Sequence, residues 1–181
     1  RCGNFVLIFN GEIYNYLELR KILKENGVIC KTKSDTEVLL NCYINFKEKC
    51  FEMFEGMFSI AIFNEKDFSL TLVRDKFGEK PLYYFKEGNS IYFGSEIKFI
   101  KSITNKKFNL DNKKINEYLF LGYKSLFKKN NSYYKKIQQI QPGSGLIIKK
   151  NKIVKFIYWT PKIERIKKVS INEAIENSKI L

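Results

Sequence analysis

The residues best suited to chemistry lie near the start of the chain. An apolar run at 5–9 is typical of a buried strand, and Asn10-Gly11 follows it directly. The Asn side-chain NH₂ and the Gly backbone N–H can donate two hydrogen bonds to one oxygen, which is the arrangement of an oxyanion hole. Glycine also lets a ligand approach the backbone closely. Glu12 beside this pair and Asp35 further along the chain could both face the ammonium group of a ligand.

Each of these residues also has an ordinary structural explanation. Asn-Gly is a common turn dipeptide, and an acidic residue such as Asp35 suits the first turn of a helix because it faces the positive end of the helix dipole. Judged on spacing alone, the structural explanation is favoured for each residue. The case for a site therefore depends on the longer segments in which these residues stand.

Several other chemistries are excluded by residue type. The chain has no histidine, so it holds neither a Ser-His or Cys-His pair nor a histidine-ligated zinc site. Its cysteines, Cys2, Cys30, Cys42 and Cys50, form no CxxC pair, and we expect reduced thiols, no metal site and a cytoplasmic location. Cys42 falls in the apolar stripe of a helix and Cys30 in a strand, so both should be packed, whereas Cys50 stands among Lys and Glu and should be exposed.

The charge of the chain is strongly basic. Its 33 Lys and Arg against 19 Asp and Glu give a net charge of +14. Arg, the favoured residue for bidentate phosphate contacts, occurs only at positions 1, 20, 74 and 165, and the Lys are spread along the chain. We therefore predict a solvated lysine-rich surface and no nucleic-acid partner. No apolar run approaches the roughly 20 residues that span a bilayer, so no membrane partner is predicted.

The first half of the chain holds the elements that must position Asn10 and Asp35. A strand at 4–9 runs into the Asn-Gly turn, a helix follows over 14–26 and stops at Gly27, and a short strand covers 28–32. The segment SDTE at 34–37 matches a capping box, with Ser34 as N-cap and Glu37 three residues later. The helix that it opens carries apolar residues at 38, 39, 42, 43 and 46.

Short strands dominate the middle of the chain. They are predicted at 58–63, 69–73, 82–85 and 90–93, and a hairpin over 145–148 and 153–158 turns at Lys150-Asn151. Helices are predicted at 95–103 with Ser95 as N-cap, at 111–120 ending at Gly122, and at 171–181. Because strands and helices come in blocks, the pattern favours an α+β fold over an alternating βαβ fold.

Longer segments together resemble glutamine-hydrolysing asparagine synthetases. The resemblance runs over roughly 4–160, and the combination of segments is far more specific than any one of them. Other class II glutamine amidotransferases share an Asn-Gly and the SDTE run, whereas the EIYN extension at 12–15, KPLYY and the closing YW favour this branch. The segments are FNGEIYNY at 9–16, ELR at 18–20, SDTE at 34–37, EGMF at 55–58, RDKFGEKPLYY at 74–84, SEIK at 95–98, EYL at 117–119, GY at 122–123, QPG at 141–143 and YW at 158–159.

The resemblance implies an N-terminal nucleophile (Ntn) glutaminase, an αββα sandwich that is incomplete at its N-terminus. In that family an N-terminal Cys attacks the glutamine amide with its own α-amine as base. Asn10 and Gly11 would form the oxyanion hole, and Glu12 and Asp35 would bind glutamine through its α-ammonium. The nucleophilic Cys would lie upstream of residue 1, because Cys2 is only eight residues before Asn10 on the same strand and follows Arg1.

The resemblance also implies how the chain is organised. Residues 1–160 would be a class II glutaminase domain lacking its N-terminal part, and 161–181 the start of an ATP-dependent synthetase domain that amidates aspartate. The partners would be L-glutamine and the protein's own C-terminal synthetase domain, and a homodimer is left open. No cofactor or metal is expected within 1–181, whereas ATP and Mg²⁺ would act in the missing synthetase domain. We expect the piece alone to be inactive.

Three alternatives remain open at this point. The ammonia could serve another carboxylate, such as a sugar acid. The domain could be a non-catalytic glutaminase-like packing partner of a synthetase domain. A basic nucleic-acid-binding module has only the charge in its support.

Overall fold

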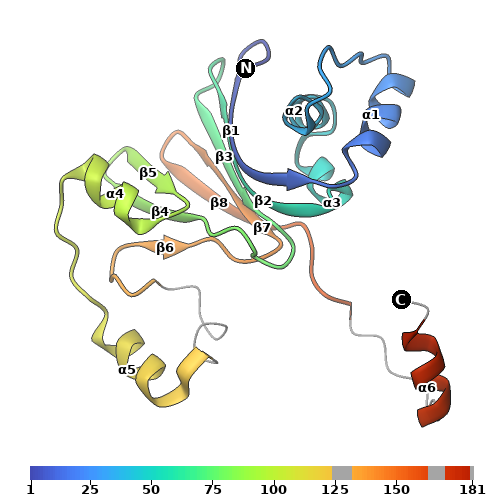
Figure 1. Cartoon of the computed structure of the whole chain (residues 1–181). Coiled ribbons are helices and arrows are strands. Elements are labelled where there is room, and N and C mark those ends of the chain that lie inside the picture. The colour runs from blue at the N-terminus through green and yellow to red at the C-terminus, as the bar shows by residue number, and fades with distance from the viewer. Residues whose placement is uncertain (124–131, 163–169, 180–181) are drawn as a thin grey trace.

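A computed structural model describes residues 1–123, 132–162 and 170–179, which form two antiparallel sheets flanked by helices (Figure 1). The larger sheet has five strands and the smaller has three, and their faces pack against each other. In spatial order the large sheet consists of β1 (Phe5–Ile13), β2 (Gly56–Asn64), β3 (Ser69–Arg74), β7 (Ser144–Lys149) and β8 (Lys152–Ile157), and the small sheet of β5 (Ser90–Gly94), β4 (Tyr83–Glu87) and β6 (Gln138–Gln139).

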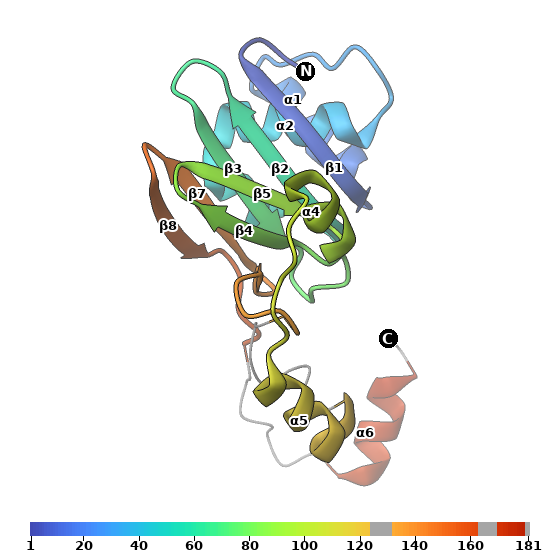
Figure 2. The same cartoon turned by 90° about the vertical axis from the view of Figure 1, so that its left-hand side faces the viewer.

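Helices cover both outer faces of this sandwich. One helical layer lies on the large sheet and α4 lies on the small sheet, whereas α5 and α6 lie outside the sandwich in both views (Figures 1 and 2). The large-sheet layer consists of α1 (Tyr16–Glu25), α2 (Asp35–Phe46), η1 (Lys47–Lys49) and α3 (Cys50–Met53). The remaining helices are α4 (Ile97–Thr104), α5 (Asn112–Leu121) and α6 (Ile171–Ser178).

Three apolar clusters hold the four layers together. The largest joins the α1–α3 layer to the large sheet through residues such as Leu23, Leu39 and Phe51, all fully buried. The second lies between the sheets, where Leu72 of one sheet meets Leu82 at the start of the other. The third joins the small sheet to α4, and its buried residues are Phe85, Ile100 and Ile137. This layering confirms the expected α+β sandwich.

Position in the sandwich explains the burial patterns of the strands. β2 lies between β1 and β3 in the large sheet, and its residues 58–62 are buried on both faces. Such a strand reads as a continuous apolar run because each face meets another layer. β1 lies at the edge of the sheet among the described strands, and its exposure alternates between half-buried and exposed residues. As an edge strand, like β8 at the other side of the sheet, β1 has backbone groups that do not pair within the sheet.

Local sequence signals predicted several elements well. Ser34 caps α2 by accepting a hydrogen bond from the Thr36 N–H at 3.1 Å, and Asp111 caps α5 in the same way. The β7–β8 hairpin turns where expected, with positive φ at both Lys150 and Asn151. All four cysteines are free thiols, as predicted.

Other predictions were wrong, and tertiary contacts explain each. Asn10-Gly11 is part of β1 and not a turn, because it pairs with β2. Residues 28–32 form no strand; the Arg20 side chain binds the carbonyl oxygens of Cys30 and Thr32 instead. Cys50 is fully buried, since α3 turns it toward the core rather than toward solvent.

The start of α4 also differs from the prediction. α4 begins at Ile97 with Glu96 as N-cap, so the prediction of Ser95 as N-cap was wrong. Residues 180–181 of the last predicted helix lie outside the described residues. None of the helices in the described part of the chain has the length and apolar character needed to cross a bilayer.

Candidate functional site

The Gly11 N–H on β1 points away from β2, toward the open edge of the large sheet. Phe58, which lies opposite Gly11, donates its N–H to the Asp75 carboxylate and accepts the Asp75 N–H at 2.9 Å. Both backbone groups of Phe58 therefore face β3, which makes Gly11 a non-hydrogen-bonded position of the antiparallel pair. Its N–H points to the open edge. Ile13, two residues on, points the same way and donates its N–H to the Asp35 carboxylate at 3.1 Å.

Glycine at position 11 is required by the pairing of the two strands. Its φ is +149°, and a Cβ there would lie 2.0 Å from the Met57 carbonyl oxygen. Gly56 on the neighbouring strand has a φ of +151°, and its Cβ would lie 2.1 Å from the Glu12 carbonyl oxygen. Ligand access was the reason expected for glycine. The structure adds a second reason, which is the close approach of β1 to β2.

The side chain of Asn10 faces the small sheet. Its Nδ2 donates a hydrogen bond to Ser95 Oγ at 3.0 Å, and Ser95 Oγ lies 3.4 Å from Ser59 Oγ. Ser59 is the residue opposite Asn10 on β2, and Ser95 directly follows β5. Asn10 and Gly11 thus present two hydrogen-bond donors at the same strand edge. Neither serine is predicted from the sequence as part of the site, although Ser95 belongs to the segment SEIK at 95–98.

The two candidate carboxylates meet at one pocket. Asp35 stands in the first turn of α2, where its second oxygen accepts the Thr36 hydroxyl at 3.2 Å. Glu12 follows Gly11 on β1, and both acids line an open cavity of about 360 Å³. This volume falls in the range of small-molecule sites. The complete lining is Glu12, Ile13, Tyr14, Tyr16, Lys33, Ser34 and Asp35.

The loop before α2 is held firmly, which fixes the position of Asp35. The Glu37 carboxylate accepts hydrogen bonds from the Thr32 hydroxyl and from the N–H groups of Thr32 and Lys31, at 2.6 to 2.8 Å. These bonds, the hydroxyl first, lower the pKa of Glu37. Glu37 therefore serves the loop and does not complete the reciprocal half of the capping box. The Arg20 guanidinium binds two carbonyl oxygens of the same loop.

The end of the FNGEIYNY segment stabilises the connection between β1 and the segment before β2. Asn15 donates its Nδ2 to the Met53 carbonyl at 2.9 Å, and its Oδ1 accepts the Glu55 N–H at 3.0 Å. The Tyr14 N–H adds a bond to the Glu55 carbonyl at 2.7 Å. These contacts tie the end of β1 to the segment before β2. They hold the strand edge on which Asn10 and Gly11 lie.

The cysteines lie away from this edge. Burial raises the pKa of Cys42 to about 12 and also raises the pKa values of Cys30 and Cys50, so these thiols stay protonated. Cys2 is exposed, and its backbone pairs with Phe5 at the far end of β1. A strand advances about 3.4 Å per residue, so Phe5 and Asn10 are about 17 Å apart. Cys2 therefore does not sit beside the Asn10-Gly11 donors.

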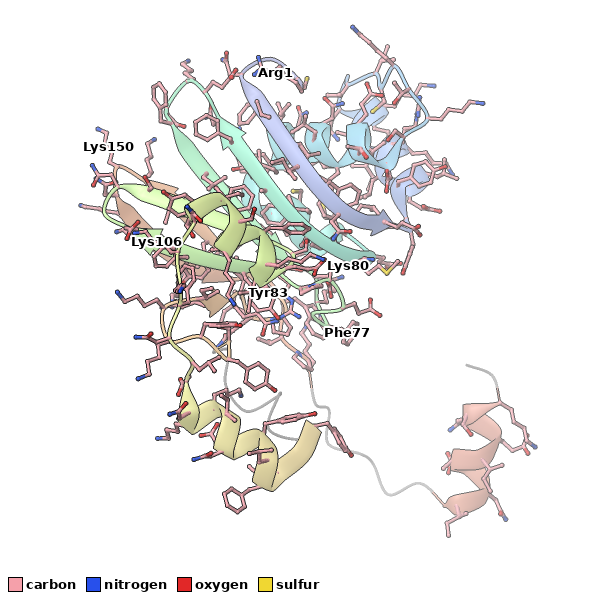
Figure 3. All side chains as sticks on the ribbon, turned by 60° about the vertical axis from the view of Figure 1, so that its left-hand side comes forward. Arg1, Phe77, Lys80, Tyr83, Lys106 and Lys150 are labelled. Atoms are coloured by element: carbon pink, nitrogen blue, oxygen red, sulfur yellow. The ribbon has the colours of Figure 1, made fainter. Side chains whose placement is uncertain are left out.

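The segment RDKFGEKPLYY builds a second polar centre, at the opposite side of β2. Asp75 is fully buried, and its carboxylate accepts the N–H groups of four residues: Phe58, Phe77, Glu79 and Lys80. The buried Arg74 guanidinium binds the carbonyl oxygens of Gly78, Lys80 and Ile140. Burial lowers the pKa of Arg74, and the Asp75 charge counteracts this. The labelled Phe77 and Lys80 show where this loop reaches the surface (Figure 3).

The described residues contain no cluster of potential metal ligands. In residues 1–123, 132–162 and 170–179 no three His, Cys, Asp or Glu side chains are grouped to hold a metal ion. In Figure 3, Lys106 and Lys150 lie on the same side of the molecule and Lys80 lies apart from them. The β1 edge therefore combines two hydrogen-bond donors, on Asn10 and Gly11, with the carboxylates of Glu12 and Asp35.

Comparison with known proteins gives matches over most of the chain. Residues 1–159 match the family described as glutamine amidotransferase domain. Asparagine synthetase [glutamine-hydrolyzing] 3 of Bacillus subtilis (strain 168) is 37% identical over 161 residues, which are 89% of this chain and 26% of that protein. Putative asparagine synthetase [glutamine-hydrolyzing] 2 of Methanocaldococcus jannaschii is 34% identical over 87% of this chain and 30% of its own length. The chain thus spans between a quarter and a third of these relatives.

A solved structure shares the fold. The glutamine phosphoribosylpyrophosphate (PRPP) amidotransferase from B. subtilis, complexed with ADP and GMP, superimposes with a TM-score of 0.63. The match covers 89% of this chain and 30% of that chain at 20% identity. This likeness supports the two-sheet sandwich.

Proposed function

From the premise that this chain belongs to the glutamine amidotransferase domain family, we propose that it is the glutamine-hydrolysing part of a glutamine-dependent asparagine synthetase. The resemblance drawn from the sequence segments is confirmed by relatives of that name at 34 to 38% identity. The observation that carries the proposal is the pair of donors at the β1 edge, the Gly11 N–H and the Asn10 NH₂.

The two donors would stabilise the charge that develops during amide hydrolysis. A thiolate that attacks the side-chain carbonyl of glutamine forms a carbon–sulfur bond and moves an electron pair onto the carbonyl oxygen. Donors already aimed at that oxygen lower the barrier most, because they need no reorganisation during the reaction. The carbon–nitrogen bond then breaks, the nitrogen takes a proton and leaves as ammonia, and water hydrolyses the thioester to glutamate.

The nucleophile in this proposal is a cysteine that precedes Arg1 in the whole protein. The positions of the cysteines within the chain support this, because three are buried and Cys2 lies at the far end of β1. The α-amine of that cysteine would act as the base, which requires no histidine. The residues of this chain would bind and orient the substrate.

Glu12 and Asp35 would bind the α-ammonium group of glutamine. Both line the open cavity, whose lining on β1 begins at Glu12, the residue after the donor pair. One Asp35 oxygen already accepts the Ile13 N–H of the same strand. This bond couples the position of the carboxylate to the strand that carries Asn10 and Gly11. Glutamine would then span the edge, with its ammonium end at the acids and its amide end at the donors.

The released ammonia would amidate aspartate in a synthetase domain of the longer protein, begun by residues 161–181. ATP and Mg²⁺ would act there, since activation of a carboxylate requires them. The names of the relatives do not favour another acceptor. Free thiols support a cytoplasmic location as part of the same proposal.

The test uses the whole protein, incubated with glutamine with and without ATP and aspartate. Glutamate release with parallel formation of asparagine supports the proposal. Glutamate without asparagine overturns the choice of acceptor. Absence of glutamate release, although the N-terminal cysteine is correctly processed, overturns the glutaminase itself.

A further inference from the structure

We propose that Ser95 is a positioning residue that orients the carboxamide of Asn10 for oxyanion stabilisation, an inference that rests on the proposed function. The two residues lie 85 positions apart and belong to different layers. Asn10 is on the edge strand of the large sheet, and Ser95 directly follows β5 of the small sheet. Their hydrogen bond of 3.0 Å therefore joins the two sheets at the site.

The bond determines which end of the Asn10 carboxamide faces the small sheet. An Asn side chain can exchange its oxygen and its NH₂ by rotation about its last bond. Ser95 Oγ accepts from Nδ2, so the NH₂ group is placed on this side. The NH₂ carries two hydrogens, and one of them remains for a ligand. Without this bond, an exposed carboxamide on an edge strand would sample several orientations.

Ser59 lies where its hydroxyl can accept the hydrogen of the Ser95 hydroxyl. The Ser59 hydroxyl lies 3.4 Å from Ser95 Oγ, and Ser59 is only 5% exposed. A hydroxyl has one hydrogen to donate. When Ser95 donates it to Ser59, its oxygen can only accept from Asn10, and the Asn10 oxygen has no donor on this side. In that arrangement the chain of bonds from Asn10 through Ser95 to Ser59 keeps the Asn10 NH₂ on the side of the small sheet.

The test compares Ser95→Ala with Ser95→Thr in the whole protein, with glutamate release as the readout. Loss of orientation weakens an interaction made in the transition state, so we expect Ser95→Ala to lower kcat and kcat/KM together by about 10-fold, with KM nearly unchanged. Ser95→Thr keeps the hydroxyl and should recover most of the activity. Ser90→Ala, the same change at the exposed start of β5, is the matched control and should equal the wild type.

The double variant Asn10→Ala with Ser95→Ala separates positioning from general damage. If Ser95 acts through Asn10, the double variant is no slower than Asn10→Ala alone. Wild-type kcat in Ser95→Ala, a change in KM alone, or additive losses in the double variant would each overturn the inference. A fall in thermal midpoint that Ser95→Thr does not restore would also overturn it, in favour of a purely structural role. A wild-type protein that releases no glutamate overturns the proposed function, and this inference with it.

Discussion

Asp75 and Asp35 differ in burial and in the number of hydrogen bonds that their carboxylates accept. Asp75 is fully buried and receives four backbone N–H groups, so its hydrogen-bonding capacity is filled from within the chain. Asp35 is half-buried, receives one backbone N–H and one hydroxyl, and lines an open cavity. An ionised carboxylate has about four acceptor sites. Asp75 therefore organises backbone, whereas Asp35 has capacity left for a ligand, and the two should respond differently to substitution.

The largest effect is expected from Asp75→Ala, on stability. Four N–H groups in a buried site would lose their acceptor, and the buried Arg74 guanidinium would lose the nearby negative charge. We expect the free energy of unfolding to fall by about 3–5 kcal/mol. Urea unfolding followed by circular dichroism measures this. A fall in the free energy of unfolding of less than about 1 kcal/mol would contradict the comparison, because Asp75 would then not stabilise the surrounding backbone.

Asn10→Ala should show the reverse pattern, with activity lost and stability kept. Removing one oxyanion donor lowers kcat by about 10²–10³-fold. The side chain is exposed, so the thermal midpoint should move little. Steady-state glutamate release by the whole protein, together with a thermal scan, gives both values. If the variant unfolds early but retains kcat, Asn10 belongs with Asp75 among the structural residues.

Asp35→Asn sharpens the comparison directly, since it is a nearly isosteric change at the second carboxylate. Loss of a charged partner for the α-ammonium group should raise KM for glutamine by about 10- to 100-fold, which corresponds to the strength of hydrogen bonds to charged groups. Stability should change by less than about 1 kcal/mol. Asp75→Asn, measured in parallel, should change stability and leave KM alone. Equal KM values in Asp35→Asn and wild type would remove Asp35 from the site.

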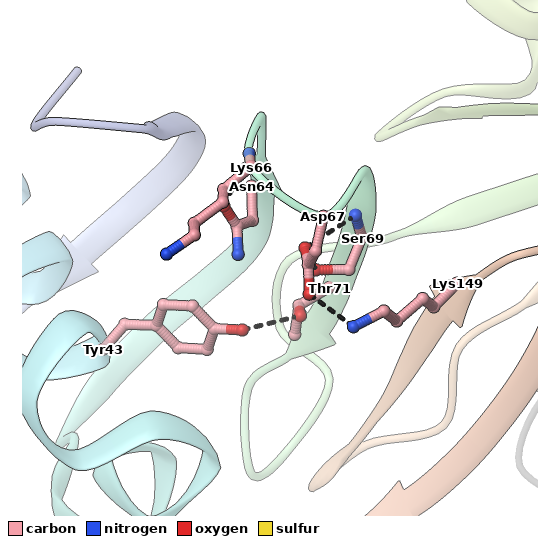
Figure 4. Close-up of polar contacts among 7 residues, drawn as sticks. All are labelled: Tyr43, Asn64, Lys66, Asp67, Ser69, Thr71 and Lys149. Atoms are coloured by element: carbon pink, nitrogen blue, oxygen red, sulfur yellow. Dashed lines mark hydrogen bonds and ion pairs between the residues drawn. The ribbon is translucent and has the colours of Figure 1, made fainter.

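The smallest effect is expected at Asp67, a partly exposed carboxylate on the turn before β3 (Figure 4). The Lys149 ammonium and the Ser69 hydroxyl, at 2.6 and 2.7 Å, lower the pKa of Asp67 to about 2. A lowered pKa means that the stabilisation is present above the ordinary pKa of 3.8 and is lost as pH falls toward 2. The stability difference between wild type and Asp67→Asn should therefore shrink between about pH 4 and pH 2.

Salt provides the control for that pair. Exposed charges are screened at 0.15 M ionic strength, so added salt should reduce the difference between the Asp67 variants but leave that of the Asp75 variants intact. A pH-independent difference would contradict the assignment of Asp67 as a paired carboxylate.

The elements that sequence predicted well are those specified locally. The Ser34 cap and the Lys150-Asn151 turn depend on residues a few positions apart, so the printed order is enough. Asn10-Gly11 has the same turn-like appearance, but pairing with β2 keeps it extended. Cys50 has charged neighbours, yet the direction of α3 relative to the sheet decides its burial. Neither direction nor pairing can be read from spacing.

The candidate site divides in the same way. Asn10, Gly11 and Glu12 are consecutive, so any fold keeps them together. Ser59 and Ser95 join them only because the two sheets pack face to face, and their separation in sequence hides this contact. The segments shared with asparagine synthetases identify candidate residues but do not indicate the role of each one. The structure divides them into those that bind backbone and those that face the open edge.

The Asp75 centre also has a consequence for hydrogen exchange. Surface loops usually exchange their amide hydrogens quickly, through local openings that need little free energy. The loop at 76–80 carries Phe77, whose side chain is 72% exposed, yet the amides of Phe77, Glu79 and Lys80 are bound to a carboxylate in the core. Releasing one of them removes one of the four N–H groups that stabilise a buried carboxylate. These amides should therefore exchange about as slowly as those of the interior strand β2, although the loop that carries them lies at the surface.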